Sequence, residues 1–212
     1  MNIFPAWTNT IRPHLVLGAL GAIVYVTVVI TYGWTPKTLY RGYQPEQPIP
    51  FSHKLHAGDL AIDCRYCHST VEVSAEAAIP PSSTCMNCHA RIFPESPKLE
   101  LLREVTLSGE AIPWVRVHDL PDFVYFDHSA HVRRGVGCVS CHGRIDTMEV
   151  VYQHEPLGMS WCITCHRDPT PHLRPLDKIT DMAWTAPSAE FGAEFARANG
   201  IKPNQNCSTC HR

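Results

Sequence analysis

The chain has 212 residues and a formal net charge of −2, with 18% charged and 44% hydrophobic residues. It carries no basic stripe, which excludes the electrostatic pattern typical of nucleic-acid binding. Pro and Gly number 18 and 12 residues, and periodic apolar runs are scarce. A conventional apolar core built from so little regular structure would be small.

Residues 15–34 form a run of uncharged residues, long enough to cross a hydrocarbon core of about 30 Å as a helix. Aromatic residues lie near both ends, as in membrane-interface belts: Trp7, Tyr32, Trp34 and Tyr40. A cleaved signal peptide is the alternative, but no small-x-small cleavage site follows the run. The sequence therefore favours a retained transmembrane anchor, with residues 1–14 as a cytoplasmic segment.

Residues 35–50 are predicted to form an extended stalk because they contain four prolines. Two matching units follow, residues 51–89 and 126–166. Each begins with Phe-x-His-x-x-His and carries two Cys-x-x-Cys-His motifs. This duplication predicts two modules of one design. Residues 90–125 then form a linker, and residues 167–212 form a tail.

Two short helices are expected outside these units. Residues 96–109 read as a helix capped by Ser96, with Pro97 in its first turn and Gly109 at its end. A second helix is predicted around residues 188–199, and Asn199-Gly200 stops it.

All ten cysteines fall in Cys-x-x-Cys pairs, and each pair is followed directly by a histidine. The cysteine pairs are Cys64/Cys67, Cys85/Cys88, Cys138/Cys141, Cys162/Cys165 and Cys207/Cys210, and the histidines are His68, His89, His142, His166 and His211. Cys-x-x-Cys-His is the attachment signature of c-type haem. The thiols bind the haem vinyl groups and the histidine is the proximal iron ligand.

Three alternative roles for the cysteines account for less of the pattern. Zinc ribbons use paired Cys-x-x-Cys but do not require a histidine after every pair. A thioredoxin-like redox site needs a single motif, and a disulfide scaffold leaves the five histidines unexplained. We therefore predict five covalently bound haem c groups. The expected fold is a multihaem cytochrome c, mostly irregular, with short helices packed round five haems and one N-terminal transmembrane helix.

The histidines of Phe-x-His-x-x-His are predicted to be distal iron ligands, because neutral imidazole is a good second axial ligand. They are His53, His56, His128 and His131. Two rings three residues apart cannot share one haem, so the four would serve four different irons. For the fifth iron Met148 is favoured, because it follows a haem motif in a segment free to fold back. The alternatives that stay open are Met159, Met182, His118, His154 and His172.

An arginine accompanies each haem motif, and some of them are expected to pair with haem propionates, because guanidinium suits planar carboxylates. These are Arg65, Arg91, Arg144, Arg167 and Arg212.

Six-coordinate irons would leave no open position for a substrate, so the sequence predicts an electron-transfer protein and not an enzyme. Attachment of c-type haem takes place on the outer side of the bacterial cytoplasmic membrane. Residues 35–212 are therefore expected on the periplasmic or outer side, held by a single membrane span.

Three stretches resemble the pentahaem cytochrome subunit of alternative complex III, a bacterial quinol:acceptor oxidoreductase. They read YQPEQPIPFSHKLHAGDLAIDCRYCH (residues 43–68), IPWVRVHDLPDFVYFDHSAH (residues 112–131) and EPLGMSWCITCH (residues 155–166). The resemblance implies integral-membrane quinol-binding subunits, an iron–sulfur subunit and a monohaem cytochrome as partners. It also implies a periplasmic electron acceptor.

Two other functions stay open from the sequence. A NapC-type anchored cytochrome would oxidise quinol directly and feed a reductase. A multihaem reductase would need one haem with an open axial position.

Overall fold

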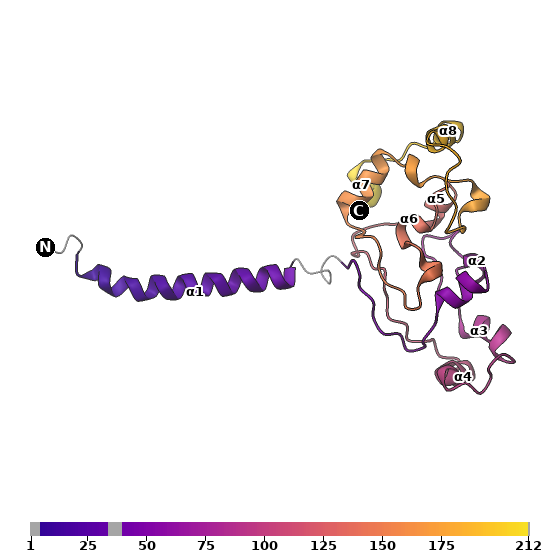
Figure 1. Cartoon of the computed structure of the whole chain (residues 1–212), viewed down its shortest axis with the longest axis horizontal. Coiled ribbons are helices and arrows are strands. Elements are labelled where there is room, and N and C mark those ends of the chain that lie inside the picture. The colour runs from indigo at the N-terminus through magenta and orange to yellow at the C-terminus, as the bar shows by residue number, and fades with distance from the viewer. Residues whose placement is uncertain (1–4, 34–39, 212) are drawn as a thin grey trace. The chain divides into compact units, whose positions relative to one another are not determined.

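The computed structural model describes residues 5–33 and 40–211, so Trp34 and residues 35–39 of the predicted stalk lie outside the described residues. The chain divides into two compact units, Met1–Arg41 and Gly42–Arg212. Figure 1 shows a single long helix in the first unit and a group of short helices joined by long connections in the second.

The described part of the first unit is dominated by α1, Trp7–Gly33. This helix is long and apolar enough to cross a membrane, a test that a signal sequence near the N-terminus also passes. It begins eight residues before the apolar run predicted from the sequence. The hydroxyls of Thr27 and Thr31 donate to the carbonyls four residues earlier, at 2.8 and 2.6 Å. These polar groups are therefore satisfied within the helix.

The second unit contains no strand among its described residues, where pairing is limited to two isolated antiparallel bridges, Val124–His211 and Val136–Leu173. Its α-helices are α2 (Cys64–Cys67), α3 (Ser82–His89), α4 (Glu100–Ser108), α5 (His128–Val132), α6 (Val139–His142), α7 (Met159–Arg167), α8 (Phe191–Ala198) and α9 (Cys207–Cys210). Shorter turns are η1 (Lys54–Asp59), η2 (Pro97–Leu99), η3 (Ile145–Thr147), η4 (Thr170–His172) and η5 (Leu176–Lys178). The fold is thus irregular with short helices, as the sequence predicts.

Both helices predicted outside the haem motifs are present. The first consists of η2 followed by α4, and Gly109 ends it with φ +77° in the left-handed conformation that glycine adopts readily. The Ser96 side chain makes no capping bond; instead its carbonyl accepts a hydrogen bond from Arg103 at 3.0 Å. The second helix is α8, which begins three residues later than predicted.

Residues 42–50 are bonded to the rest of the second unit. The Gly42 amide donates to the Gln153 carbonyl at 2.7 Å. The Gln47 side chain bonds the backbone of Val115 twice, donating at 2.8 Å and accepting at 3.0 Å. This part of the predicted stalk is therefore not a free linker. Prolines keep it out of a helix, but its amides and carbonyls still need partners, which the second unit supplies.

The apolar core of the described residues is small. Its buried side chains are Ile49, Leu102, Val105, Val132, Met148, Leu173, Ile179 and Met182. By contrast, many large apolar side chains of the second unit are exposed, among them Tyr66, Val73, Ile79, Ile92, Phe93, Phe123, Tyr125 and Met159. Burying each such group stabilises a fold by about 1.5–3 kcal/mol. The second unit therefore has much apolar surface for which protein atoms provide no cover.

Candidate haem centres

Each Cys-x-x-Cys-His motif coincides with one short helix and its cap residues, namely α2, α3, α6, α7 or α9. Because residues three apart lie on the same face of a helix, this places both sulfur atoms of a motif on one side. In the first, third and fifth motifs the histidine amide closes the turn. The His68, His142 and His211 amides donate to the carbonyl of the first cysteine at 2.8, 3.0 and 2.9 Å. The local fold thus presents two thiols and an imidazole together.

All ten cysteines are free thiols. Burial raises the pKa of Cys138 to about 11 and that of Cys141 to about 12, so both thiols are protonated at neutral pH. No group of three or more His, Cys, Asp or Glu side chains within residues 5–33 and 40–211 is arranged to hold a metal ion. The described cysteines therefore form neither disulfides nor the tetrahedral cluster that a zinc ribbon requires.

The ten cysteines differ in exposure. Cys88 is exposed, as is Cys207 in the fifth motif, whereas the other eight cysteines are partly buried. Within the second motif, burial raises the pKa of Cys85. Cys88 lies near the end of α3. The chain turns there, and the backbone amides of Arg91 and Ile92 donate hydrogen bonds to the Cys88 carbonyl at 3.0 and 2.9 Å. The protein alone therefore does not place Cys88 in an enclosed site, and its role in haem attachment stays a prediction based on the motif.

Seven of the nine predicted histidine ligands direct Nδ1 to a backbone carbonyl. The acceptors are Ser52 for His56 (2.9 Å), Ala78 for His68 (2.9 Å), Ile92 for His89 (3.0 Å), Ala75 for His128 (2.8 Å), Asp127 for His131 (2.7 Å), Asn204 for His166 (2.7 Å) and Phe123 for His211 (3.3 Å). A carbonyl only accepts, so Nδ1 carries the proton and Nε2 keeps a free lone pair. This is the arrangement typical of a metal-ligating histidine.

The phenylalanine of Phe-x-His-x-x-His contacts both histidines in the same way in the two repeats, residues 51–89 and 126–166. Phe51 stacks on His56 with ring centroids 4.4 Å apart and contacts His53 edge-on at 4.8 Å. Phe126 repeats this with His131 at 4.6 Å and with His128 at 4.7 Å. The sequence alone suggested no role for these phenylalanines. Their recurrence at the same position in both repeats could have indicated that they orient the histidines.

In each repeat (residues 51–89 and 126–166) the second predicted distal histidine lies near the predicted proximal histidine of the second motif. The ring centroids of His56 and His89 are 6.2 Å apart, and those of His131 and His166 are 6.1 Å apart. With a metal–nitrogen bond of about 2.0–2.1 Å and about 1.1 Å from nitrogen to ring centre, two imidazoles on opposite sides of one metal ion have centroids about 6.2–6.4 Å apart. Both pairs therefore have the spacing that one iron requires.

The remaining distal histidines gather with the proximal histidines of the first and third motifs. Burial, with smaller effects of neighbouring histidines, lowers the pKa of His53 and His118 to about 4 and that of His142 to about 3. These rings are neutral at pH 7, the form that binds metal. His53 Nδ1 and His118 Nε2 are buried without a hydrogen-bond partner. The rings of His118 and His142 are 4.5 Å apart, closer than two ligands of one iron.

The open candidates for the fifth distal ligand differ in exposure. Met148 and Met182 are buried among protein atoms, at 5% and 9% exposure, whereas Met159 is 70% exposed. Met159 begins α7, one turn before Cys162. Burial and, secondarily, the nearby Cys210 thiol raise the pKa of Cys162, so the fourth and fifth motifs are neighbours. The prediction that Met148 is the ligand stays untested.

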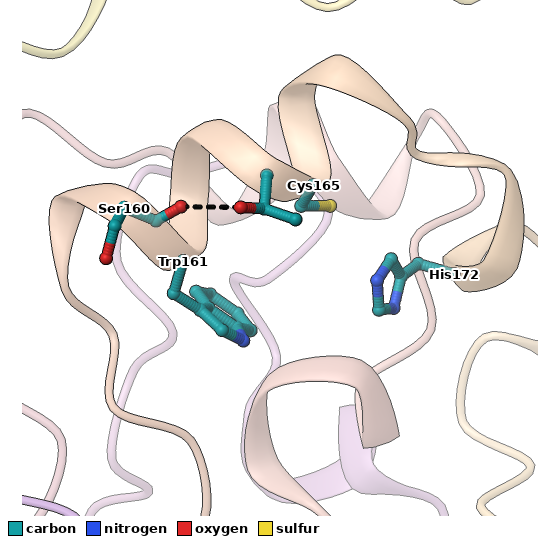
Figure 2. Close-up of a pocket in the computed structure, with 5 residues that line it drawn as sticks. Ser160, Trp161, Cys165 and His172 are labelled. Carbon is teal, nitrogen blue, oxygen red and sulfur yellow. Dashed lines mark hydrogen bonds between the residues drawn. The ribbon is translucent and has the colours of Figure 1, made fainter.

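A pocket lies directly beside the fourth motif. Ser160, Trp161, Thr164, Cys165 and His172 line it. Figure 2 shows the Trp161 and His172 rings and the Cys165 sulfur bordering this pocket. His154, another open candidate, packs against Gly143, where a side chain would collide with its ring.

The arginines near the motifs are partly occupied by carboxylates. Arg65 pairs with Asp63 at 2.9 Å and with Glu72 at 3.1 Å. Arg144 pairs with Asp146 at 2.8 Å. Both guanidiniums therefore have carboxylate partners within the protein. Arg212 lies outside the described residues.

The donor set and its surroundings fit haem c. Free thiols in pairs, imidazoles with free Nε2 and two ring pairs at the spacing of one iron supply attachment and ligation. Exposed apolar side chains and the pocket at Cys165 supply surfaces that a flat apolar group would cover.

Comparison with protein families agrees with this geometry. Residues 124–212 match the family model described as cytochrome c7 and related cytochrome c. Residues 124–212 therefore have the short-helix fold of a cytochrome c7-like multihaem domain. Cytochromes c of this family bind haem c covalently through Cys-x-x-Cys-His motifs.

A curated relative is the menaquinone reductase multiheme cytochrome c subunit of Nitratidesulfovibrio vulgaris (Hildenborough). It is 36% identical to this chain over 128 residues, which is 59% of this chain and 59% of the relative. The chain thus spans about three fifths of the length of the curated relative that it matches.

Proposed function

We propose that this chain is a membrane-anchored pentahaem cytochrome c. It relays electrons between a quinone-reacting membrane complex and an acceptor on the periplasmic or outer side, and it carries out no substrate chemistry of its own. Bound haem c supplies one-electron redox chemistry. The residues of the chain attach, ligate and orient the haems and close their axial positions.

The observation that carries this proposal is the spacing of the two histidine pairs at 6.2 and 6.1 Å. A haem ligated by both members of a pair has no open coordination position, which suits electron transfer and not substrate binding. The hydrogen bonds from Nδ1 of His56 and His131 to the carbonyls four residues earlier fix the tautomers of these rings. Stacking on Phe51 and Phe126 then restricts rotation of the rings.

The attachment and ligation sites follow the same geometry. All ten cysteines attach haem, and His68, His89, His142, His166 and His211 are the proximal ligands. His56 and His131 are distal ligands opposite His89 and His166. His53 and His128 serve the first and third motifs, which lie in the histidine cluster around His142.

For the fifth motif, exposure now favours Met159 over Met148. A methionine that ligates iron points its sulfur at the haem face and not into the protein core, and Met159 is the exposed one of the two. Axial methionine raises a haem potential relative to bis-histidine ligation, so this haem would be the highest-potential centre.

The partners are proposed from two sources. The resemblance to alternative complex III implies quinol-binding integral subunits, an iron–sulfur subunit and a monohaem cytochrome. In that setting electrons run from quinol to a periplasmic acceptor. The relative named menaquinone reductase favours a second possibility, in which a similar complex passes electrons into the quinone pool.

One purification tests the proposal. The full-length chain, produced with its neighbouring membrane proteins and isolated in mild detergent, should show five haem additions by intact mass. It should also co-purify with integral quinone-binding subunits, and the reduced complex should not bind carbon monoxide. Four or fewer additions with free thiols would overturn the pentahaem assignment. Carbon monoxide binding to the unmodified protein would indicate a reductase with an open haem.

The direction of transfer and the NapC-type alternative need a second measurement on the same complex. Menaquinol should reduce the haems without added donor if the complex oxidises quinol. Reoxidation of prereduced haems by menaquinone, with no reduction by menaquinol, would indicate the opposite direction. Quinol oxidation by the isolated chain, free of other subunits, would instead indicate the NapC-type function.

A further inference from the structure

Arg174 is a buried charged side chain without a salt bridge to any carboxylate among the described residues. It is 6% exposed. Its Nη1 donates to the Asp181 carbonyl at 2.7 Å and to the Lys178 carbonyl at 3.4 Å, while Nε is buried without a partner. Within residues 40–211, no carboxylate lies at salt-bridge distance from this guanidinium. Burying an unpaired charge is costly, so its retention calls for an explanation.

The guanidinium is held beside the third haem motif by a tight local structure. Leu173 pairs with Val136 in an isolated bridge, and the Arg174 amide donates to the Gly135 carbonyl at 2.8 Å. A Cβ on Gly137 would collide with Nε and Cζ of the guanidinium, so only glycine leaves room for it. Residue 137 is followed directly by Cys138. The side chain is thereby fixed next to the start of this motif.

Two further contacts enclose the charge. Cζ of Arg174 lies 5.2 Å from the centroid of the Trp184 ring, within the range of a cation–π contact. The loop that supplies the carbonyl acceptors also holds the motif itself, since the Cys138 amide donates to the Ile179 carbonyl at 3.2 Å. Carbonyl dipoles and an aromatic face therefore solvate the guanidinium without cancelling its charge.

A fixed positive charge in this position acts on a redox group. Guanidinium does not deprotonate in proteins, so the charge is constant at every accessible pH. Away from solvent it is poorly screened, and its interaction with neighbouring charges is correspondingly strong. A haem gains one negative charge on reduction, so a nearby buried cation stabilises the reduced state.

We propose that Arg174 raises the reduction potential of the haem attached at Cys138 and Cys141. The inference rests on the proposed function, because a haem must be bound at this motif. It adds an electrostatic determinant of haem potential that acts independently of the axial ligands.

The first test replaces the charge within the full-length protein. Arg174→Gln keeps a donor for the carbonyls and removes the charge, whereas Arg174→Lys keeps the charge. We expect the Gln variant to lower the equilibrium constant for reduction of one haem at least tenfold. For a one-electron couple this is a fall in reduction potential of about 59 mV. The Lys variant should retain most of the wild-type value. Arg197→Met, which removes a charge from the exposed face of α8, should shift no haem.

A second pair of variants keeps Arg174 and tests the charge if the Gln variant does not assemble. Trp184→Glu places a carboxylate where the aromatic ring faces the guanidinium and should lower the same potential. Trp184→Gln, of matching size and no charge, should lower it much less. Potentials are read from a redox titration followed by spectra that separate the haems, with the low-spin signals confirming unchanged axial ligands.

The outcomes separate this inference from the proposed function. Intact mass reports whether the third motif carries haem, and a missing haem there contradicts the proposed function. Five haems with no shifted component in Arg174→Gln or Trp184→Glu would overturn the inference alone. Equal shifts in the Gln and Lys variants, or in the two Trp184 variants, would assign the effect to packing and would also overturn it.

Discussion

Removing His56 should open an axial position on one haem of the five. The His56 and His89 rings are 6.2 Å apart, the separation of two ligands on one iron. His56→Ala should therefore turn one of five haems, about a fifth of the total haem, from low spin to high spin. The reduced variant should bind one carbon monoxide per chain.

The substitution should leave the fold and the haem attachment intact. The His56 side chain bonds the Ser52 carbonyl at 2.9 Å and stacks on Phe51 at 4.4 Å, and its backbone bonds are kept in the alanine variant. Together the two side-chain contacts contribute about 1–3 kcal/mol, which is small beside a typical stability of about 5–15 kcal/mol. Intact mass should thus still show the wild-type haem count.

Carbon monoxide titration of the reduced protein and the high-spin signal of the oxidised protein measure the effect. Added imidazole should restore the low-spin spectrum by filling the vacated space. Lys54→Ala is the matched control, because Lys54 lies on the same turn but points its amine to Glu149 at 3.3 Å. A fully low-spin His56→Ala protein that binds no carbon monoxide would refute the pairing of His56 with His89.

Three further outcomes are expected. Met159→Leu should abolish the methionine–iron charge-transfer band of the oxidised protein and Met148→Leu should leave it in place; the reverse result would restore Met148 as the ligand. Asp63→Asn should lower the free energy of unfolding by about 1 kcal/mol at pH 7, because it removes the carboxylate charge that the Arg65 guanidinium binds at 2.9 Å, whereas asparagine can still cap α2. Bonding to Arg65 lowers the pKa of Asp63 to about 2, so this stabilisation is present above pH 4 and the difference in denaturation midpoint should vanish as pH falls towards 2. Gly192→Ala should destabilise the protein by about 1–3 kcal/mol in denaturant titration, because its Cβ would collide with the Thr170 carbonyl.

The sequence predicts the attachment and ligand residues from local patterns, but it does not predict their spatial arrangement. Covalent spacing alone defines Cys-x-x-Cys-His, so the attachment motifs need no knowledge of the fold. The two short helices were predictable because Pro97, Gly109 and Gly200 mark their ends by backbone conformation. These are local properties, which a sequence records directly.

What the sequence could not give depends on contacts between distant segments. The facing of His56 and His89 joins residues 33 positions apart, and no periodic pattern encodes such a pairing. The attachment of residues 42–50 to the rest of the unit was missed for the same reason, because prolines indicate an extended chain but not its neighbours. Arg174 was missed because a buried guanidinium far along the chain from Cys138 has no sequence signature.

The helix that carries His128 and His131 is bonded to residues 72–75, a loop of the first repeat (residues 51–89). The His128 amide and Nδ1 both bond the Ala75 carbonyl, at 3.1 and 2.8 Å. Nearby, the Ser129 amide bonds the Ser74 carbonyl at 3.1 Å, and Arg133 Nε bonds the Glu72 carbonyl at 2.8 Å. This loop lies between the first two haem motifs.

The two repeats are therefore not separable modules. A fragment that begins at residue 90 would retain both motifs of the second repeat but would lose the carbonyls that seat its distal ligands. Maturation should accordingly have an order: the loop between the first two motifs must take its shape before the distal histidines of the second repeat can lock into place. Haem loading of the emerging chain from its N-terminal side satisfies that order.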